Sequence, residues 1–214
     1  KSHSVLTSFP GDPDVPTADK WEESGHAIII PNGGKDADKT NIISLEGDKV
    51  TLEKTVFSEQ GTSIKVRNLF YNVPARRNFL KSDFVELRHI IDSFNRISLS
   101  YPDIEFNLIH NNEELFYLKK SNLRKRISSI FGRKIDENLI PLNEKTSLVK
   151  ITGFTLKPQF SKKSKNNQFL FVNNRYIKSQ FLNHSINNAY EGLLREGFYP
   201  GYFIFLEINP NKID

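Results

Sequence analysis

Cysteine is absent from the 214-residue sequence, and long apolar runs are absent as well. Without cysteine the chain has no disulfide bond, no thiolate zinc site and no cysteine nucleophile, which favours a reducing, cytoplasmic compartment. The most apolar stretches, HAIII and YFIFLEI, have the length of a strand, so we expect no membrane-spanning helix. The segment KSHSVLTSFPGDPDVP lacks the apolar core of a secretory signal peptide.

Motifs of hydrolytic and metal-dependent enzymes are also missing. The histidines show no metal-ligand spacing; they are His3, His26, His89, His110 and His184. His89 and His184 lie within helical patterns, where we expect structural roles. No GxSxG, GxGxxG or Walker P-loop motif is present. The sequence therefore predicts no metal site and no catalytic residue of these classes.

The net charge of +5 is unevenly distributed. Between Lys119 and Lys178 there are fifteen Lys and Arg residues and three Asp and Glu residues. The rest of the chain contains fifteen basic and twenty-two acidic residues, a net charge of −7. Such a local excess is expected of a surface that binds a polyanion. A soluble basic surface with no partner is the alternative, because the cations belong to several separate elements.

The first hundred residues show three kinds of pattern. Residues 1–40 are proline-rich and acidic, and only HAIII has strand character. Alternating apolar residues predict two short strands in NIISLEGDKVTLEK and an amphipathic strand in GTSIKVRNLF. Pro74 predicts the first turn of a short helix over PARRNFLK, with Asn72 as its N-cap. A longer helix is predicted over SDFVELRHIIDSFNRISLSYP, where Pro102 stops the pattern, with apolar residues at helical spacing: Phe84, Leu87, Ile91, Phe94 and Ile97.

After Pro102, which we take as a domain boundary, the patterns predict the order β-β-α-β-β-α-β. A hairpin is expected to turn at Asn111–Asn112, and a helix over SNLRKRISSIFG to end at Gly132. Strands are predicted in SLVKITGFTLKP, QFLFVNNRYIK and GYFIFLEINP. Between the last two we expect a helix from Ser179 to Gly197 that buries Leu182, Ile186, Ala189, Leu193 and Leu194. The fold class is therefore α+β, with helices covering a sheet.

The basic region offers candidate contacts to phosphate groups. Lys162, Lys163 and Lys165 lie in a polar loop, and Arg175 and Lys178 lie at and beyond the turn VNNR. Long cationic side chains on loops suit phosphate contacts, which contribute affinity without sequence specificity. Arg124, in the same region, is a further candidate. Phe169 and Phe171 alternate as core residues do, so we do not interpret them as base-stacking residues.

Three stretches carry a family resemblance: GTSIKVRNLFYNVPARRNFLK, QFLFVNNRYIKSQFLNHSINNAYEGLL and YFIFLEINPNKID. In order and spacing they resemble the GT-x-V-x-x-L-F-x-N-x-P-A-R, V-N-x-R and F-L-x-I-x-P motifs of the MutL family, which acts in bacterial DNA mismatch repair. The resemblance covers about residues 40–214. It implies that 41–100 form the C-terminal part of a GHKL-type ATPase domain. It further implies that 101–214 form a DNA-binding and transducer domain with the ribosomal protein S5 domain 2-like fold, and it leaves 1–40 unassigned.

The resemblance also implies residue roles and partners. Gly61 and Thr62 match the motif that helps to line the nucleotide pocket, and Arg175 matches an arginine of the DNA-binding groove. Asn72, Pro74 and Arg76 match the structural signature at the end of the ATPase domain, where Arg76 and Arg77 are expected to hold the domain junction rather than to bind DNA. The implied partners are DNA, bound without sequence specificity, the mismatch-recognition protein MutS, and a second MutL subunit. The implied cofactors of the parent protein are ATP and Mg²⁺.

The chain also departs from the family pattern. It lacks the E-x-x-x-N-x-x-D-A helix with its catalytic Glu and magnesium-binding Asn, the D-x-G-x-G loop, and the G-F-R-G-E-A-L lid. It ends before the V-N-V-H-P-x-K motif, whose lysine binds the terminal phosphate. Because phosphoryl transfer needs these groups, we expect that this chain alone neither binds ATP tightly nor hydrolyses it. The alternative function is a non-catalytic scaffold whose basic surface binds acidic proteins.

Overall fold

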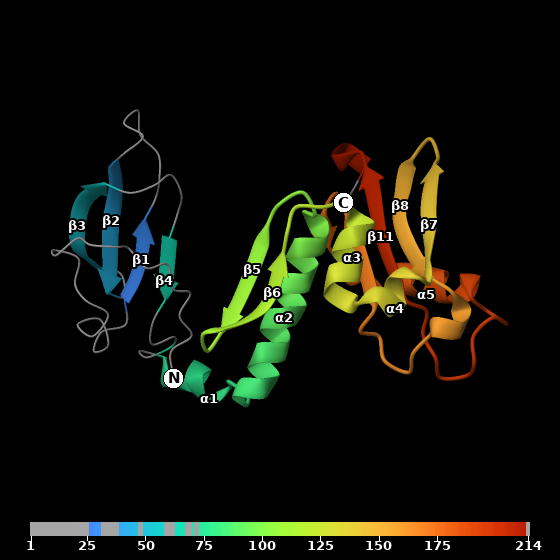
Figure 1. Ribbon diagram of the computed structural model, residues 1–214, viewed down its shortest axis with the longest axis horizontal. Helices are drawn as coiled ribbons and strands as arrows, with labels where there is room; N and C mark the ends of the chain where they lie inside the picture. The colour runs from blue at the N-terminus through green and yellow to red at the C-terminus, as the bar shows by residue number, and fades with distance from the viewer. Residues whose placement is uncertain are drawn as a thin grey trace. The chain divides into compact units, whose positions relative to one another are not determined.

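A four-stranded antiparallel sheet forms the first part of the computed structural model, which describes residues 26–30, 39–46, 49–57, 63–66, 70 and 73–212. The sheet has the order β3-β2-β1-β4 and consists of β1 (His26–Ile30), β2 (Lys39–Glu46), β3 (Lys49–Phe57) and β4 (Ser63–Val66). Each predicted strand of this region is confirmed (Figure 1). The register of the β2–β3 pair shifts between Ser44 and Leu45, where the alternation of faces is interrupted.

Two helices follow the first sheet. Helix α1 (Pro74–Asn78) begins with proline at its first turn, as predicted, but its N-cap is Val73 and no side chain caps it. The prediction of Asn72 as the cap is therefore wrong, and Asn72 itself lies outside the described residues. Helix α2 (Asp83–Ser100) confirms the longer predicted helix, and it ends two residues before Pro102. Its buried residues are Asn95, Ser98, Leu99 and Ser100, whereas Phe84 and Ile97 are exposed, contrary to the apolar face drawn from helical spacing.

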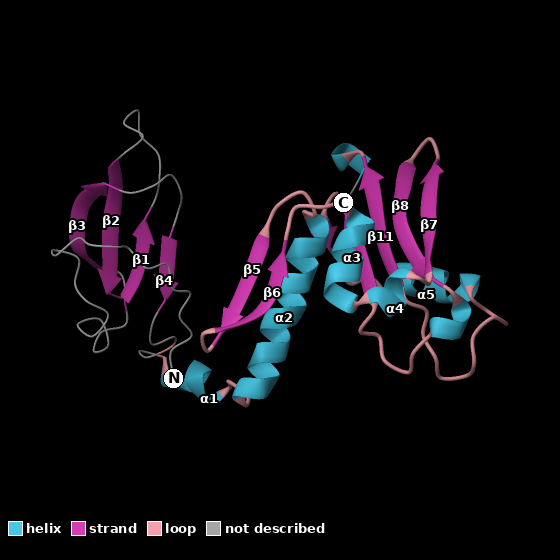
Figure 2. Cartoon of the chain, viewed as in Figure 1, coloured by secondary structure: helices cyan, strands magenta, loops and turns pink. Residues whose placement is uncertain are grey.

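A five-stranded sheet organises the rest of the chain (Figure 2). Its order is β10-β9-β11-β8-β7, with β7 (Leu139–Lys145), β8 (Val149–Leu156), β9 (Gln168–Val172), β10 (Arg175–Tyr176) and β11 (Tyr202–Ile208). Strands β9 and β11 are parallel, and the other neighbours are antiparallel. The remaining elements are β5 (Phe106–His110), β6 (Glu113–Leu118), α3 (Leu123–Phe131), α4 (Arg133–Asp136), α5 (Gln180–Ala189) and the short 3₁₀ helices at Pro158–Phe160 and Pro210–Lys212. The α+β class is confirmed.

The two faces of this sheet bury different helices. On one face, Phe169, Phe171 and Phe203 pack with Leu99 of α2 and Ile127 of α3. On the other face, the alternate residues of the same strands pack against α5; they are Leu170, Tyr202 and Ile204, with Leu182 and Ile186 from the helix. The period of two along β9 and β11 thus builds two apolar layers from adjacent residues. The predicted core roles of Phe169 and Phe171 are confirmed.

The structure corrects two predictions in this region. Strand β7 contains Pro141 and was not expected; proline is tolerated there because β7 is the edge of the sheet. Helix α5 ends at Ala189 rather than at Gly197, because Gly192 has a φ of 75° and the Tyr190 and Glu191 amides donate to carbonyls three residues back. Consequently Ala189 and Leu193 are exposed rather than buried.

The chain divides into two compact units, the first comprising 1–83 and 109–113 and the second 84–108 and 114–214. The second unit begins within α2, because Ser98 and Leu99 of that helix are fully buried and Leu99 belongs to the core that covers β9 and β11. This division by contacts differs from the family boundary near Pro102, which stays a prediction. None of the helices in the described part of the chain is long and apolar enough to cross a membrane.

A buried arginine joins the elements of the second unit. Arg126 of α3 has no exposed surface, and its guanidinium donates to the carbonyl oxygens of Pro102 (2.8 Å), Ile104, Leu118 and Lys119. Its guanidinium carbon also lies 5.4 Å from the ring centroid of Phe106. Burial lowers the pKa of Arg126, and the carboxylate of Asp103 acts in the opposite direction. The backbone carbonyls compensate part of the cost of burying this charge.

Replacing Arg126 with Met should destabilise the chain by about 3 kcal/mol, because four carbonyl oxygens lose their donor. Urea unfolding would measure the loss. Arg133→Met is the matched control: Arg133 is exposed and forms a surface ion pair with Glu137 at 2.9 Å, so it should cost less than about 1 kcal/mol. Equal losses in the two variants would show that the buried arginine has no special role.

Candidate nucleic-acid interface

Arg175 stands directly after a tight turn between β9 and β10. Asn173 and Asn174 form the turn with φ angles of 48° and 63°. Two successive residues with positive φ are typical of the turn that suits a hairpin with two loop residues, and asparagine tolerates this conformation better than most residues. The Arg175 side chain is exposed, and no hydrogen bond or ion pair engages it within the described part of the chain. The turn therefore presents a cation at a defined place on the edge of the sheet.

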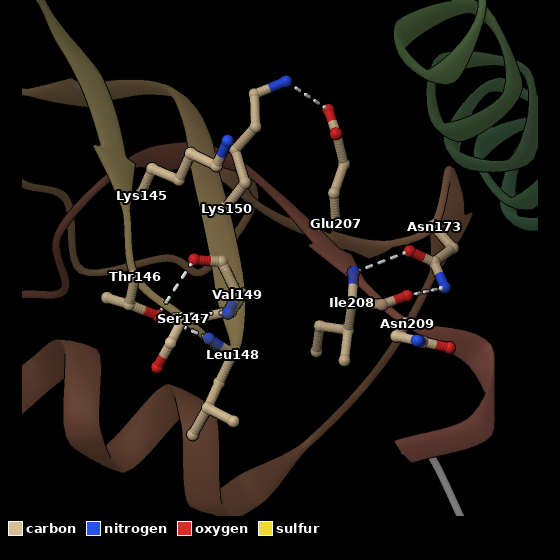
Figure 3. A pocket seen from close by; sticks show the side chains of 10 residues that line it. All are labelled: Lys145, Thr146, Ser147, Leu148, Val149, Lys150, Asn173, Glu207, Ile208 and Asn209. Atoms are coloured by element: carbon tan, nitrogen blue, oxygen red, sulfur yellow. Dashed lines mark hydrogen bonds and ion pairs between the residues drawn. The ribbon is translucent and has the colours of Figure 1, made fainter.

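The side chain of Asn173 fixes this turn to the centre of the sheet. Its Nδ2 donates to the carbonyl oxygen of Ile208 at 2.9 Å, and the Ile208 amide donates to its Oδ1 at 3.0 Å (Figure 3). The Asn173 main-chain amide also donates to the carbonyl oxygen of Leu206 at 2.9 Å. Asn173 thus continues the hydrogen bonding of β11 beyond the end of β9. Arg175 is positioned by the sheet rather than by a free loop.

The turn and the end of β11 also border an open hollow of about 480 Å³. On its far side Lys150 pairs with Glu207 at 2.9 Å, and Thr146 closes the β7–β8 turn by accepting from the Leu148 and Val149 amides (Figure 3). The charges of Lys150 and Glu207 therefore cancel each other. Lys145 is then the one lining cation without an ion pair among the described residues, so this hollow offers a ligand a single positive charge.

The lysines of the basic loop are positioned by backbone hydrogen bonds or by aromatic rings. Lys162 is fixed by its backbone: its amide donates to the Tyr199 carbonyl at 3.2 Å and its carbonyl accepts from the Tyr199 amide at 2.8 Å. The ammonium of Lys163 lies 5.9 Å from the ring centroid of Phe198, and that of Lys165 lies 4.5 Å from the ring centroid of Tyr199. Cation–π contacts orient these side chains without neutralising their charge. The three lysines and Lys178 are exposed, and no ion pair among the described residues involves them.

The remaining predicted residues differ in their surroundings. Arg124 forms an ion pair with Asp136, with its Nε 2.7 Å from Oδ1, so its charge already has a partner inside the protein. Arg76 lies exposed on α1. Gly61, Thr62 and Asn72 lie outside the described residues. Among the residues that the structure covers, no cluster of three His, Asp or Glu side chains could hold a metal ion.

Sequence reasoning missed one cation of this region, Arg96 of α2. Its guanidinium lies 4.3 Å from the ring centroid of Tyr176, and it shares a cavity with Lys165 and Lys178. Arg96 lies 23 residues before the basic region that begins at Lys119, so a local count of charges does not find it. Only the packing of α2 beside β10 brings it to the lysines.

Comparisons with known proteins place the chain in a family. The family model described as the C-terminal domain of DNA mismatch repair proteins matches residues 127–214. The MutL protein of Christiangramia forsetii is 52% identical over 172 residues, which are 80% of this chain and 28% of that protein. The MutL protein of Phocaeicola vulgatus is 42% identical over 173 residues, which are 81% of this chain and 28% of that protein. The chain belongs to the MutL family of DNA mismatch repair proteins.

Solved structures agree with this assignment at the level of the fold. The Aquifex aeolicus MutL ATPase domain complexed with ADP matches with a TM-score of 0.68 at 21% identity. The match covers 90% of this chain and 71% of the Aquifex chain. The N-terminal domain of a DNA repair protein has a TM-score of 0.73 at 21% identity, with 86% and 61% covered. The predicted MutL ATPase-region fold is thereby confirmed. The chain spans about 28% of the length of the MutL relatives that it matches.

Asn173 gives a test of how this MutL turn is built. Asn173→Ala should destabilise the chain by about 2 kcal/mol, because it removes both side-chain hydrogen bonds. In addition, alanine adopts a positive φ less readily than asparagine does. Asn173→Gly removes the same bonds but accepts the φ angle, so it should lose about 1 kcal/mol less. Urea unfolding measures both losses. A stability equal to that of the unmodified chain in both variants would contradict the anchoring role.

Proposed function

We propose that this chain is the DNA-binding part of the N-terminal region of a cytoplasmic MutL protein. In the proposal, residues 41–100 form the C-terminal part of a GHKL-type ATPase domain. Residues 101–214 form an S5 domain 2-like domain that binds duplex DNA without sequence specificity. The single observation that supports it best is a group of exposed cations that have no acidic partner among the described residues: Lys162, Lys163, Lys165, Arg175 and Lys178. Cations that no carboxylate neutralises remain available to phosphates and release counterions from DNA on binding.

The geometry suits phosphate contacts better than base recognition. Arg175 begins the two-residue strand β10 directly after a turn, and Lys162, Lys163 and Lys165 lie in a loop, so these cations do not line one face of a helix or long strand that could enter a groove of DNA. The phenylalanines of the neighbouring strand β9 are buried: Phe169 is 6% exposed and Phe171 is fully buried, which leaves neither ring for base stacking. Binding of this kind depends on salt and carries no sequence information.

We extend the proposal to the parent protein. Family membership supports a mismatch-repair matchmaker that binds ATP and Mg²⁺, dimerises, and couples mismatch recognition by MutS to strand incision. Gly61 and Thr62 would help to line its nucleotide pocket, and Arg76 would hold the domain junction. One solved relative, the Aquifex aeolicus MutL ATPase domain, was obtained with ADP. Arg124 is the weakest of our DNA-contact candidates, because a DNA phosphate would have to compete with Asp136 for its guanidinium.

Arg175→Glu tests the DNA contact. It should weaken duplex binding roughly tenfold at low salt and reduce the slope of log K against log salt by about 1, because one phosphate contact is lost. Fluorescence anisotropy across a salt series measures both quantities. Lys134→Glu is the matched control, since Lys134 is an exposed cation on α4 and the charge change is the same. Equal effects of the two substitutions would show that DNA binding depends on net charge alone and would contradict a specific contact of Arg175.

The purified chain should not hydrolyse ATP. It has no catalytic Glu, no magnesium-binding Asn and no phosphate-binding Lys in the family's motifs, and phosphoryl transfer depends on such groups for water orientation and charge stabilisation. Phosphate release from Mg-ATP would be measured against a heat-denatured sample. ATP hydrolysis that co-elutes with the chain in a final gel-filtration step would refute this expectation.

A further inference from the structure

A cavity of about 520 Å³ lies within the second unit and is lined by residues of four segments. Helix α2 supplies Asp92 and Arg96, and the basic loop before β9 supplies Lys165. Tyr176 of β10 lies between them, and the segment from β10 to the start of α5 adds Lys178 and Asn183. Its volume lies in the range of small-molecule sites. Lys165 and Lys178 belong both to the proposed DNA-binding surface and to this cavity, whereas Arg175, the residue that tests DNA binding, does not line it.

Positive charge dominates the lining. The cations are Arg96, Lys165 and Lys178, and the single carboxylate is that of Asp92. No ion pair within 4.0 Å involves any of the four among the residues that the structure describes. The lining therefore carries three formal positive charges and one formal negative charge, a formal net charge of +2. Such an uncompensated charge inside a concave site attracts an anion.

Two of the cations are held in place by aromatic rings. The Arg96 guanidinium lies 4.3 Å from the ring centroid of Tyr176, and that ring packs edge-on against the buried Phe171 at 5.9 Å. The Lys165 ammonium lies 4.5 Å from the ring centroid of Tyr199. A ring orients a cation but leaves its N–H groups without an acceptor, unlike a carboxylate. The donors of the cavity are thus positioned before any ligand arrives.

Asn183 adds a neutral donor. Its Oδ1 accepts from the buried hydroxyl of Tyr202 at 2.7 Å, which identifies Nδ2 as the group left to donate. Burial raises the pKa of Tyr202 to about 12, so the hydroxyl keeps its proton and its role as donor. Asn183 also lies in the first turn of α5, whose amide dipoles favour a negative charge.

We propose that this cavity binds a phosphomonoester, the terminal phosphate of a single nucleotide. A phosphomonoester carries a charge of about −1.5 to −2 at pH 7, which matches the lining better than the single charge of a backbone phosphodiester. The cavity is larger than a phosphate group needs, and the Tyr176 ring with Leu170 and Ile177 provides an apolar wall for the organic part. Free mononucleotides and 5′-phosphorylated DNA ends share this chemistry, and the experiment separates them.

The direct test uses the 214-residue chain at low salt with deoxyadenosine monophosphate, deoxyadenosine and inorganic phosphate as probes. Titration followed by NMR should show saturable binding of the monophosphate at one site, with weaker binding of inorganic phosphate and none of deoxyadenosine. The amide signals of Tyr176, Gln180 and Asn183 should shift most. Absence of saturation by the monophosphate, or shifts confined to other segments, would overturn the proposal.

Two substitutions address the site itself. Asn183→Asp is isosteric and still accepts from Tyr202, but it adds a negative charge and should weaken monophosphate binding at least about tenfold. Arg96→Gln removes one cation and should act in the same direction. Lys134→Glu, on α4, should leave binding unchanged. Thermal unfolding reports whether each variant folds; if Asn183→Asp does not, Arg96→Gln carries the test. Unchanged affinity in the folded variants would refute the site.

A second arm identifies the source of the phosphate and keeps this inference separate from DNA binding. A duplex with 5′-phosphate ends is compared with the same duplex bearing 5′-hydroxyl ends. A preference for the phosphate that Asn183→Asp abolishes supports the site and identifies a DNA end as its source. Monophosphate binding without that preference supports the site and identifies a free nucleotide. Arg175→Glu should weaken duplex binding and spare the monophosphate, so the two proposals fail independently.

Discussion

The parallel pairing of β9 with β11 is the contact on which the second unit depends. Its register places Phe169 beside Phe203 and Phe171 beside Phe205, and the rings of both pairs stack, with centroids 5.5 and 4.4 Å apart. Phe131 of α3 packs on the first pair and closes this layer. A parallel pair cannot be joined by a tight turn, so the chain must leave β9, cross the sheet and return. That excursion contains β10 and α5, and with them Arg175, Lys178 and Asn183. The parallel pairing of β9 with β11 therefore accounts both for the stacked phenylalanines at the centre of the sheet and for the crossover segment that carries these polar residues.

Cations in this unit serve two opposite purposes, and their partners distinguish them. Arg126 is fully buried, and its Nη1 and Nη2 atoms donate to backbone carbonyl oxygens inside the protein, whereas its buried Nε has no partner among the described residues. Arg96 and Lys165 instead rest against aromatic rings, which orient them and leave their donors unused. Because the cost of burying a charge falls only when its donors are satisfied, the first arrangement is structural and the second suits a ligand. A charge count along the sequence treats Arg126 and Lys165 alike and leaves Arg96 outside the basic region.

The local rules of the sequence identified most elements but not their assembly. Paired asparagines marked both hairpin turns, and Asn122 and Ser179 accept hydrogen bonds at the starts of α3 and α5. Strand β7 was missed because Pro141 is compatible with a strand only at an edge, and edge position is a tertiary property. Helix α5 was drawn too long because its apolar spacing continues past the glycine that ends it. The cavity could not be predicted at all, since Arg96 and Asn183 are brought together only by packing across the edge of the sheet.

The motifs that indicated the MutL family are physically one unit. VNNR and FLEINP lie about thirty residues apart in the sequence, yet Asn173 of the first exchanges two hydrogen bonds with Ile208 of the second. An alanine in the first motif would leave the Ile208 amide and carbonyl at the end of β11 without these partners, and a different backbone after β11 would remove the anchor of the turn. Each motif therefore constrains the other through the backbone rather than through shared chemistry. Arg175 benefits from this constraint without contributing to it, because its own side chain takes no part in the anchoring bonds. The turn can thus hold its geometry whatever residue occupies that position, which separates the stability of the fold from the affinity of the surface it presents.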